Sequence, residues 1–316
     1  MGVTREEAVL AYRMFLGREP ESEDVIRSTM AARDIREIRL RFLGSPEFQA
    51  QYNAHAPLAV GRFMDVTKID VDIDCSAEQL QLMFDRIAKA WQDFGHTEPH
   101  WSVMVDEAFK QAHIGENIEA FYDSGKHDVE FFLNFVRRSG ISPSFEKALD
   151  YGCGVGRLTM ALSDYARHVT GLDISPPHLR LGTERARDQG IANVAFETVA
   201  KVADLDRYTG FDLVISRIVL QHNPPPVMAA IYAKLLLALA PGGMAVVQMP
   251  TYIHQQSFSA ARYLDTDQPQ MEMNGLPQSI IFSIIEEAGC RVLEVREDES
   301  TGNVPGLSHI FAVQKR

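Results

Sequence analysis

Residues 148–158, ALDYGCGVGRL, place three glycines at every second position behind an acidic residue. Glycine tolerates positive φ and lets a ligand approach the backbone N–H groups closely, so Gly152, Gly154 and Gly156 predict a binding loop. A tight strand-to-helix turn without a ligand is the alternative. Asp173 ends the next apolar run, HVTGLD, and favours the binding loop, because a carboxylate there can accept the hydroxyls of a ribose. An N-cap for the following helix is a second, compatible role for Asp173.

The glycine spacing separates two kinds of nucleoside ligand. A dinucleotide fingerprint has the spacing G-x-G-x-x-G, whereas this loop has G-x-G-x-G. A dinucleotide needs the longer gap and the helix N-terminus for its pyrophosphate. A ligand without phosphate needs neither, although an amino acid part would need groups for its ammonium and carboxylate. The loop therefore favours a phosphate-free nucleoside.

Short apolar runs alternate with amphipathic stretches on both sides of this loop. The predicted parallel strands are KALDYG, HVTGLDIS, NVAFETV, the first part of GFDLVISRIVL, and GGMAVVQMP. Such alternation implies right-handed crossovers and a mostly parallel α/β sheet with helices on both faces. RVLEVRED and SHIFAVQKR follow with no helix between them and predict an antiparallel pair. Ligands bind such sheets at the carboxyl ends of the strands, where the glycine loop lies.

The chain before this region shows helical spacing only. Thr4 is a plausible N-cap and Gly17 a stop signal for the first helix. The expected helices cover residues 4–17, 23–43, 76–94 and 127–138, with a further helix start at Ser45–Pro46. The predicted order is a small all-helical domain at 1–55, a linker at 56–75, a helical lid segment at 76–140 and the sheet domain at 141–316.

Composition restricts the class of protein. The formal charge is −12 and no dense Lys/Arg cluster occurs, which argues against nucleic acid as a partner. Three cysteines without motif spacing suit a reducing compartment and argue against a disulfide framework or a zinc site. The N-terminus lacks an apolar signal core, and the longest apolar stretch is too short for a membrane span. These features predict a cytoplasmic protein without a metal site.

Four motifs in order, ALDYGCGVGRL, VTGLDIS, GFDLVISRIVLQH and LAPGGMAVVQMP, resemble the class I S-adenosylmethionine-dependent methyltransferases over about residues 140–316. The resemblance implies a Rossmann-like, seven-stranded, mostly parallel sheet that a C-terminal antiparallel hairpin closes, and S-adenosyl-L-methionine as the cofactor. AYRMFLGREP with a later GSPEF resembles a small helical domain of unknown function found beside bacterial glycosyltransferases and methyltransferases. That second resemblance implies a bacterial chain and points toward surface glycans.

The methyltransferase resemblance implies roles at the matched positions. The methionine moiety is assigned to Asp150, Gly152, Cys153, Gly154, Gly156 and Arg157, the ribose to Asp173, the adenine to Ile174, and the sulfonium side to Ser216, Arg217 and Ile218. Many relatives have an Asp after the third strand that meets the adenine amino group. Here Ala200 stands there, which leaves the backbone around Lys201 and Val202, or Asp204, for that contact.

Methyl transfer to a hydroxyl needs an aligned nucleophile and a group that removes its proton. His222, just after the fourth strand, is the candidate base, because its ordinary pKa lies near neutrality. A histidine that ties its loop to the backbone is the alternative. Gln221 and Asn223 either orient the substrate or cap the next helix.

Three segments predict a lid: residues 91–104, 117–125 and the long polar insert 250–278. Trp101 and Tyr122 either cover the adenosine or line the acceptor site, and ordinary packing is their alternative. Tyr252, in the insert, is assigned to the substrate.

The resulting prediction is a methyltransferase that acts on a small molecule or a glycan precursor, at oxygen. A nicotinamide-dependent oxidoreductase and a non-catalytic cofactor-binding scaffold are the alternatives. In the scaffold, the N-terminal helical domain would dock a protein partner.

Overall fold

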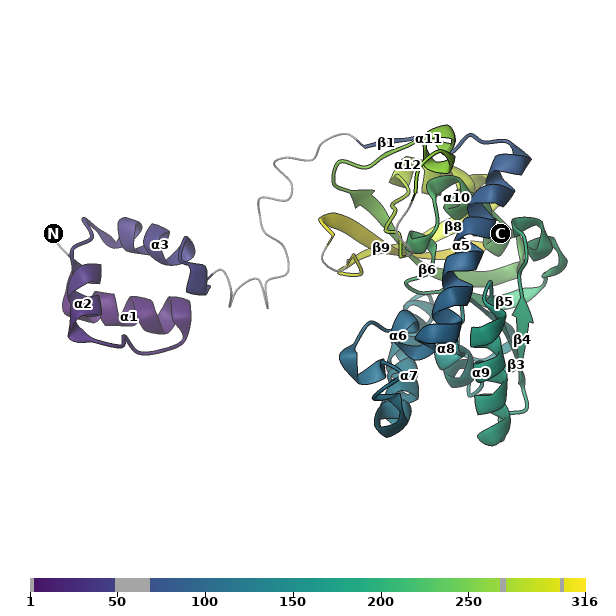
Figure 1. The fold of residues 1–316 in the computed structure, drawn as a ribbon, viewed down its shortest axis with the longest axis horizontal. Helices are drawn as coiled ribbons and strands as arrows, with labels where there is room; N and C mark the ends of the chain where they lie inside the picture. Colours follow the sequence, from purple (N-terminus) through teal and green to yellow (C-terminus); the bar gives the residue numbers. More distant parts are fainter. Residues whose placement is uncertain (1–2, 49–68, 268–270, 302–303) are drawn as a thin grey trace. The chain divides into compact units, whose positions relative to one another are not determined.

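The computed structural model of the chain describes residues 3–48, 69–267, 271–301 and 304–316. Two compact units make up the chain, residues 1–66 and residues 67–316. Figure 1 colours them along the sequence, the first in purple and the second from blue to yellow.

The first unit contains three short helices, α1 (Arg5–Leu16), α2 (Glu23–Met30) and α3 (Ile35–Leu43). Thr4 caps α1 and Gly17 ends it in a left-handed conformation, which confirms the helix predicted over 4–17. The helix predicted over 23–43 is two helices, because Asp34 accepts a hydrogen bond from the Glu37 N–H and starts a new one. Their buried side chains form a small core of Val3, Ala8, Ala11, Leu16, Ile26, Ala32, Ile38, Phe42 and Phe48.

The helix start predicted at Ser45 is present, since the Phe48 N–H donates to the Ser45 hydroxyl. The rest of that helix and residues 56–68 of the predicted linker lie outside the described residues. At the end of the predicted linker, β1 (Asp70–Val71) pairs in parallel with β7 (Ser257–Phe258). This two-residue ladder was not predicted, because nothing local in either segment indicates a partner so distant in sequence.

The second unit is built on a seven-stranded sheet with the order β4-β3-β2-β5-β6-β9-β8. The first five strands in that order are parallel, and β9 pairs antiparallel with both β6 and β8. The mostly parallel sheet and its C-terminal antiparallel hairpin are therefore confirmed. The strands are β2 (Phe145–Tyr151), β3 (Ala166–Asp173), β4 (Val194–Thr198), β5 (Phe211–Ser216), β6 (Leu239–Ile253), β8 (Cys290–Asp298) and β9 (Gly306–Lys315).

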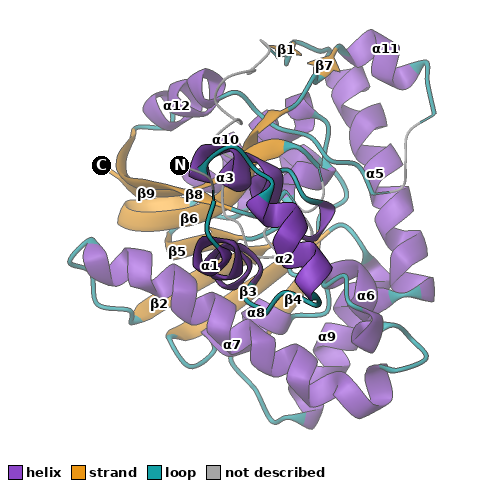
Figure 2. Cartoon of the chain, turned by 90° about the vertical axis from the view of Figure 1, so that its left-hand side faces the viewer, coloured by secondary structure: helices purple, strands orange, loops and turns teal. Residues whose placement is uncertain are grey.

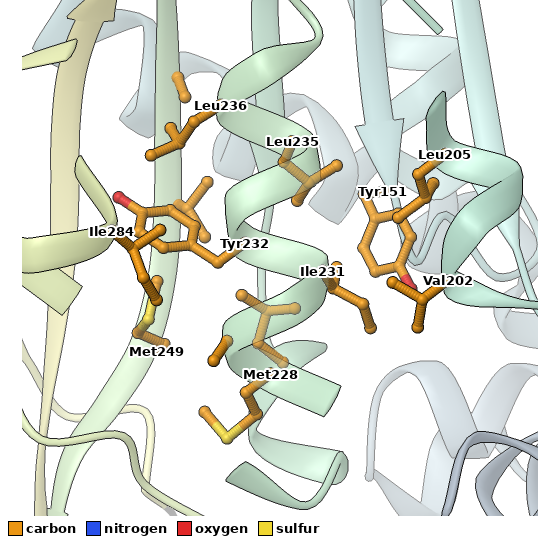
Figure 3. Packing of buried hydrophobic residues seen from close by; sticks show 14 of the residues in the cluster. Tyr151, Val202, Leu205, Met228, Ile231, Tyr232, Leu235, Leu236, Met249 and Ile284 are labelled. Atoms are coloured by element: carbon orange, nitrogen blue, oxygen red, sulfur yellow. The ribbon is translucent and has the colours of Figure 1, made fainter. Parts of the chain in front are cut away.

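Helices cover both faces of the sheet (Figure 2). One apolar cluster joins the sheet to α5 (Ala77–Thr97), α10 (Pro225–Leu237) and α12 (Gln278–Glu287), and another joins it to α7 (Ile114–Arg138) and α8 (Arg157–Leu162). In Figure 3, Tyr232 of α10 points toward Ile284 and Met249, whereas Ile231 points toward Tyr151. The remaining described elements are α6 (Pro99–Val103), α9 (Pro176–Asp188), α11 (Ala260–Leu264) and the short 3-10 turns η2 (Glu107–Phe109), η3 (Val202–Arg207) and η4 (Leu220–His222).

Helix α7 is longer than the predicted helix over 127–138 and includes residues 117–125, which were predicted as part of a lid. Its apolar spacing continues through Phe121 and Val129, both of which are buried. At Gly125, a Cβ atom would lie 2.3 Å from the Arg157 carbonyl oxygen, so α7 packs directly on the start of α8. This segment therefore supports the glycine loop from behind.

The parallel arrangement brings the carboxyl ends of β2, β3 and β5 to one edge of the sheet, beneath α5 and α6. Among the described helices, none is long and apolar enough to cross a membrane.

Candidate active site

A cavity of about 380 Å³ lies at this edge of the sheet. Its walls come from the ends of the strands, from α5 and α6, and from the insert that follows β6. The predicted site residues that line it are Asp150, Gly152, Cys153, Gly154, Arg157, Asp173, Ile174, Arg217, Ile218, Gln221, His222 and Asn223. Residues distant in sequence therefore meet around one hollow.

The glycine loop needs glycine for two reasons. Gly152, Gly154 and Gly156 have φ values of +74°, +53° and +83°, which residues with a Cβ atom rarely adopt. A Cβ on Gly152 would lie 2.3 Å from Val219 Cγ1, and one on Gly154 would lie 2.5 Å from Val103 Cγ2. The missing side chains let Val219 and Val103, which also line the cavity, pack directly on the loop.

The N–H groups of this loop are already engaged. Those of Gly152 and Cys153 donate to the Leu172 carbonyl, and that of Gly154 donates to Asp173 Oδ2 at 2.8 Å. The expectation that these glycines expose backbone N–H donors is therefore not supported, and the loop contributes backbone surface to the cavity wall. Cys153 is buried, and this burial raises the pKa of its thiol and so disfavours the nucleophilic thiolate.

Two carboxylates are held beside the loop. Asp173 accepts hydrogen bonds from the Gly154 and Ser175 N–H groups, one on each oxygen. Each of its oxygens keeps a second lone pair for a hydroxyl donor. Asp150 accepts a 2.7 Å hydrogen bond from Thr159 Oγ1, and burial raises the pKa of Asp150 to about 6.

A charged cluster forms the wall on the α7 side. Asp128 Oδ2 lies 2.6 Å from Arg157 Nη2, and Asp128 Oδ1 lies 3.2 Å from Arg217 Nη2. The Nε atoms of both arginines are buried and have no hydrogen-bond partner among the described residues. Two guanidinium groups and one carboxylate leave a net positive charge. The sequence does not single out Asp128, because nothing in its helical segment indicates a binding residue.

His222 lies in η4 on the opposite wall. Its Nδ1 is 2.7 Å from the Glu272 carbonyl oxygen. A carbonyl can only accept, so Nδ1 carries the proton and Nε2 of the neutral ring is an acceptor. Burial lowers the pKa of His222, and Trp91 packs against it with ring centroids 5.3 Å apart.

Helix α5 and the insert close the cavity over His222. Arg86 of α5 donates to the carbonyls of Tyr263, Leu264 and Thr266. The Glu272 carboxylate accepts hydrogen bonds from Tyr263 and from Asn274. The further lining residues from these segments are Ile87, Trp91, Met271 and Met273. Sequence reasoning found the insert but not these side chains, because their meeting depends on how the segments pack.

Five predicted site residues lie outside the cavity wall. Gly156 faces the Phe196 ring, 2.6 Å from where its Cβ would lie, and the Ser216 hydroxyl donates to the Tyr151 carbonyl. Both residues therefore have packing roles that the motif does not distinguish from ligand contact.

Three aromatic residues complete this group. Tyr122 packs on Phe121 and beneath the Arg185 guanidinium, Trp101 packs on Phe94, and the Tyr252 hydroxyl is 3.3 Å from His254 Nδ1. Their predicted contacts with a ligand lack support from these positions.

The segment after β4 also lies away from the cavity wall. Asp204 accepts hydrogen bonds from the N–H groups of Ala200 and Lys201 and so holds the start of η3. Neither Asp204 nor the backbone at Lys201 and Val202 is placed to contact a ligand in this cavity. The described residues contain no group of three or more His, Cys, Asp or Glu that could hold a metal ion.

Comparison with known proteins agrees with this arrangement. Residues 148–243 match the methyltransferase domain family. A ubiquinone biosynthesis O-methyltransferase of Methylococcus capsulatus is 36% identical over 98 residues, which are 31% of this chain and 40% of that protein. An uncharacterized RNA methyltransferase of Halalkalibacterium halodurans is 30% identical over 93 residues, 29% of this chain and 20% of that protein.

Among solved structures, magnesium protoporphyrin IX methyltransferase of Synechocystis with bound S-adenosylmethionine matches with a TM-score of 0.50 and 17% identity. The match covers 73% of this chain and 97% of that one, and shows a shared fold. The two curated relatives are matched over less than half of their own length. Residues 148–243 of this chain therefore match a methyltransferase domain, and the second unit shares its fold with a methyltransferase that was solved with bound S-adenosylmethionine.

Proposed function

We propose that the protein transfers a methyl group from S-adenosylmethionine to a hydroxyl of a small molecule. One observation carries the proposal. A glycine floor, a ribose-type carboxylate and a histidine with a fixed tautomer share a single cavity. The methyltransferase domain supports the reaction class.

The residues present fit the cofactor. The backbone of Gly152, Cys153 and Gly154 forms part of the cavity wall, where a ligand can approach it closely. Asp173 has lone pairs for the two ribose hydroxyls, and Ile174 offers an apolar surface for the adenine. When bound, S-adenosylmethionine supplies a methyl group whose bond to sulfur breaks, with its electron pair left on sulfur, as the acceptor oxygen attacks.

The charged cluster suits the amino acid end of the cofactor. An ammonium and a carboxylate together carry both signs of charge, as do Asp128 and the two arginines, Arg157 and Arg217. Both arginines line the cavity, and their guanidinium groups can donate hydrogen bonds to a carboxylate there.

His222 is the proposed base. The Glu272 carbonyl holds the Nδ1 proton, so Nε2 accepts the proton of the acceptor hydroxyl as the new bond to oxygen forms. Trp91 and the methionines of the insert, Met271 and Met273, exclude water from this side.

The small-molecule acceptor is favoured by the size of the cavity, about 380 Å³, and by relatives whose names include ubiquinone biosynthesis O-methyltransferases. A glycan precursor is the second acceptor class, supported by the resemblance of the N-terminal unit. We further propose that the protein works in the cytoplasm and that its N-terminal unit is the surface for any protein partner.

Calorimetry on the full chain tests the proposal. S-adenosylmethionine and S-adenosylhomocysteine should bind at micromolar concentration, and NAD should not shift the melting temperature. A melting temperature raised by NAD would instead support the oxidoreductase. Two results together would support the scaffold. The protein would bind the cofactor without releasing S-adenosylhomocysteine across a panel of phenols, hydroxy acids and sugar nucleotides, and residues 1–55 would capture a protein partner.

A further inference from the structure

A buried glutamine on β6 determines which polar atoms face the acceptor. Gln248 is fully buried, and its Oε1 accepts a 2.8 Å hydrogen bond from the Ile218 N–H. Its Nε2 donates to Gln221 Oε1 at 3.1 Å and to the Ser308 hydroxyl at 2.6 Å. Gln248 itself does not line the cavity, whereas Ile218 and Gln221 do.

The amide groups of this hydrogen-bond network can be oriented in only one way. A backbone N–H can only donate, so the amide oxygen of Gln248 must face Ile218. The Nε2 of Gln248 then faces Gln221, whose side chain must accept this hydrogen bond through its own amide oxygen. Gln221 Nε2 has no hydrogen-bond partner among the described residues and is not a buried atom, so it is the group that Gln221 presents to the cavity.

The backbone at this point is strained. Ile218 has a φ of +56°, which is a costly conformation for a β-branched residue. Its hydrogen bond to Gln248 helps to hold that conformation. Strain of this kind persists where the surroundings fix it, often at a site.

The neighbouring residue has the opposite polarity. His222 donates through Nδ1 to the Glu272 carbonyl, which leaves its Nε2 as an acceptor. Two consecutive side chains of η4 therefore present a donor and an acceptor to one cavity.

We propose, on the basis of the methyltransferase function above, that the acceptor is an aromatic or enolic compound with two oxygens on adjacent carbons. The hydroxyl that is methylated donates to His222 Nε2, and the second oxygen accepts from Gln221 Nε2.

Two further observations narrow the chemical class of the acceptor. The walls beside these groups include Trp91, Met271 and Met273, which suit the face and edge of an aromatic ring. Burial lowers the pKa of His222, so it is a weak base. A weak base removes a proton from a phenol, whose pKa is about 10, more readily than from an ordinary sugar hydroxyl.

The test uses the full chain saturated with S-adenosylhomocysteine and two isomeric probes, 2-methoxyphenol and 4-methoxyphenol. Only the first has its second oxygen on the adjacent carbon. We expect the wild-type protein to bind 2-methoxyphenol about tenfold more tightly by calorimetry, the effect of one hydrogen bond.

Two variants assign the preference to Gln221. Gln221→Leu should bind both isomers equally. Gln221→Glu keeps an oxygen toward Gln248 but replaces the donor with a second oxygen, and should prefer 4-methoxyphenol. Gln278→Leu changes an exposed glutamine outside the cavity and should retain the wild-type preference.

The wild-type measurement decides the proposal even where a variant does not fold. Equal affinity for the two isomers, or binding of neither, overturns the acceptor class while S-adenosylhomocysteine binding leaves the methyltransferase function intact. A preference that survives in Gln221→Leu also overturns it. Failure of S-adenosylhomocysteine to bind the wild-type chain overturns both proposals.

Discussion

The two walls of the cavity are built in different ways. The cofactor wall comes from one short stretch, the loop after β2, together with Asp173 at the end of β3. The acceptor wall joins α5, the turn after β5 and the insert after β6. Backbone conformation determines the first wall, and side-chain contacts between distant segments determine the second.

This difference separates the expected effects of mutation. Changes in the cofactor wall should alter cofactor affinity, because the loop conformation and its carboxylates form the binding surface. Changes in the acceptor wall should alter turnover and acceptor choice, because His222 and Gln221 are oriented by other side chains and carbonyls.

The largest effect is expected for Gly152→Ala. The new Cβ would require a left-handed alanine and would overlap Val219, a combined cost of about 4 kcal/mol. The loop must move to relieve the overlap, so the affinity for S-adenosylhomocysteine should fall at least about 100-fold by calorimetry.

Gly190→Ala is the matched control. Gly190 has a φ of +68° and nothing within 4 Å of its Cβ position, so this variant has the backbone strain without the overlap. It should lose stability and keep its cofactor affinity. Equal losses of affinity in the two variants would mean that the floor of the cavity is not the binding surface.

His222→Ala tests the acceptor wall. Loss of the base should lower kcat about 100- to 1,000-fold, with S-adenosylhomocysteine affinity changed less than about twofold. His254→Ala, at an exposed histidine of the insert, should retain normal turnover. Normal kcat in His222→Ala would rule out the proton-accepting role.

The pH dependence of kcat sharpens the same assignment. A base must be neutral to accept a proton, and burial lowers the pKa of His222 below its ordinary value of 6.5. Turnover should therefore stay high as the pH falls to 6.5 and decline only below it. The other titratable or charged groups in the wall around His222 are Glu272, Arg86 and Tyr263. Burial raises the pKa of the Glu272 carboxyl group, and Arg86 and Tyr263 lie beside that group.

Asp150→Asn tests the electrostatics of the cofactor wall. Burial raises the pKa of Asp150 from 3.8 to about 6, so the folded protein binds a proton that the unfolded chain releases between these values. Stability should fall as the pH rises through this range, by about 3 kcal/mol for this group.

The asparagine amide introduced by Asp150→Asn would keep an oxygen for Thr159 and remove the titration. Urea unfolding at pH 4 and pH 7 should then show a smaller loss of stability in Asp150→Asn than in the wild-type protein. An identical loss of stability in the two proteins would show that ionisation of Asp150 costs the folded protein little free energy.

Asp173→Ala has the smallest expected effect. Loss of a charged acceptor for the ribose hydroxyls should weaken S-adenosylhomocysteine binding by about 2 kcal/mol. Asp164→Ala, at an exposed position after α8, serves as the control. Unchanged calorimetric affinity in Asp173→Ala would contradict the assignment of the ribose.

The sequence was most informative where one local rule governs the structure. The alternation of apolar runs and helices predicted the parallel sheet, and two runs without an intervening helix predicted the antiparallel hairpin. The positive φ of all three loop glycines was also implied by their residue type. The break between α2 and α3 was missed, because a capping aspartate resembles an ordinary exposed residue within an amphipathic pattern.

Local sequence alone determined the sheet, the glycine floor and the carboxylate at the end of β3, because strand periodicity and glycine conformation act over a few residues. Tertiary structure decided that Asp128 joins Arg157 and Arg217, that the Glu272 carbonyl orients His222, and that Gln248 sets the polarity of Gln221. Those outcomes depend on hydrogen bonds and ion pairs between residues 27 to 89 positions apart in the chain, and such contacts have no local signature.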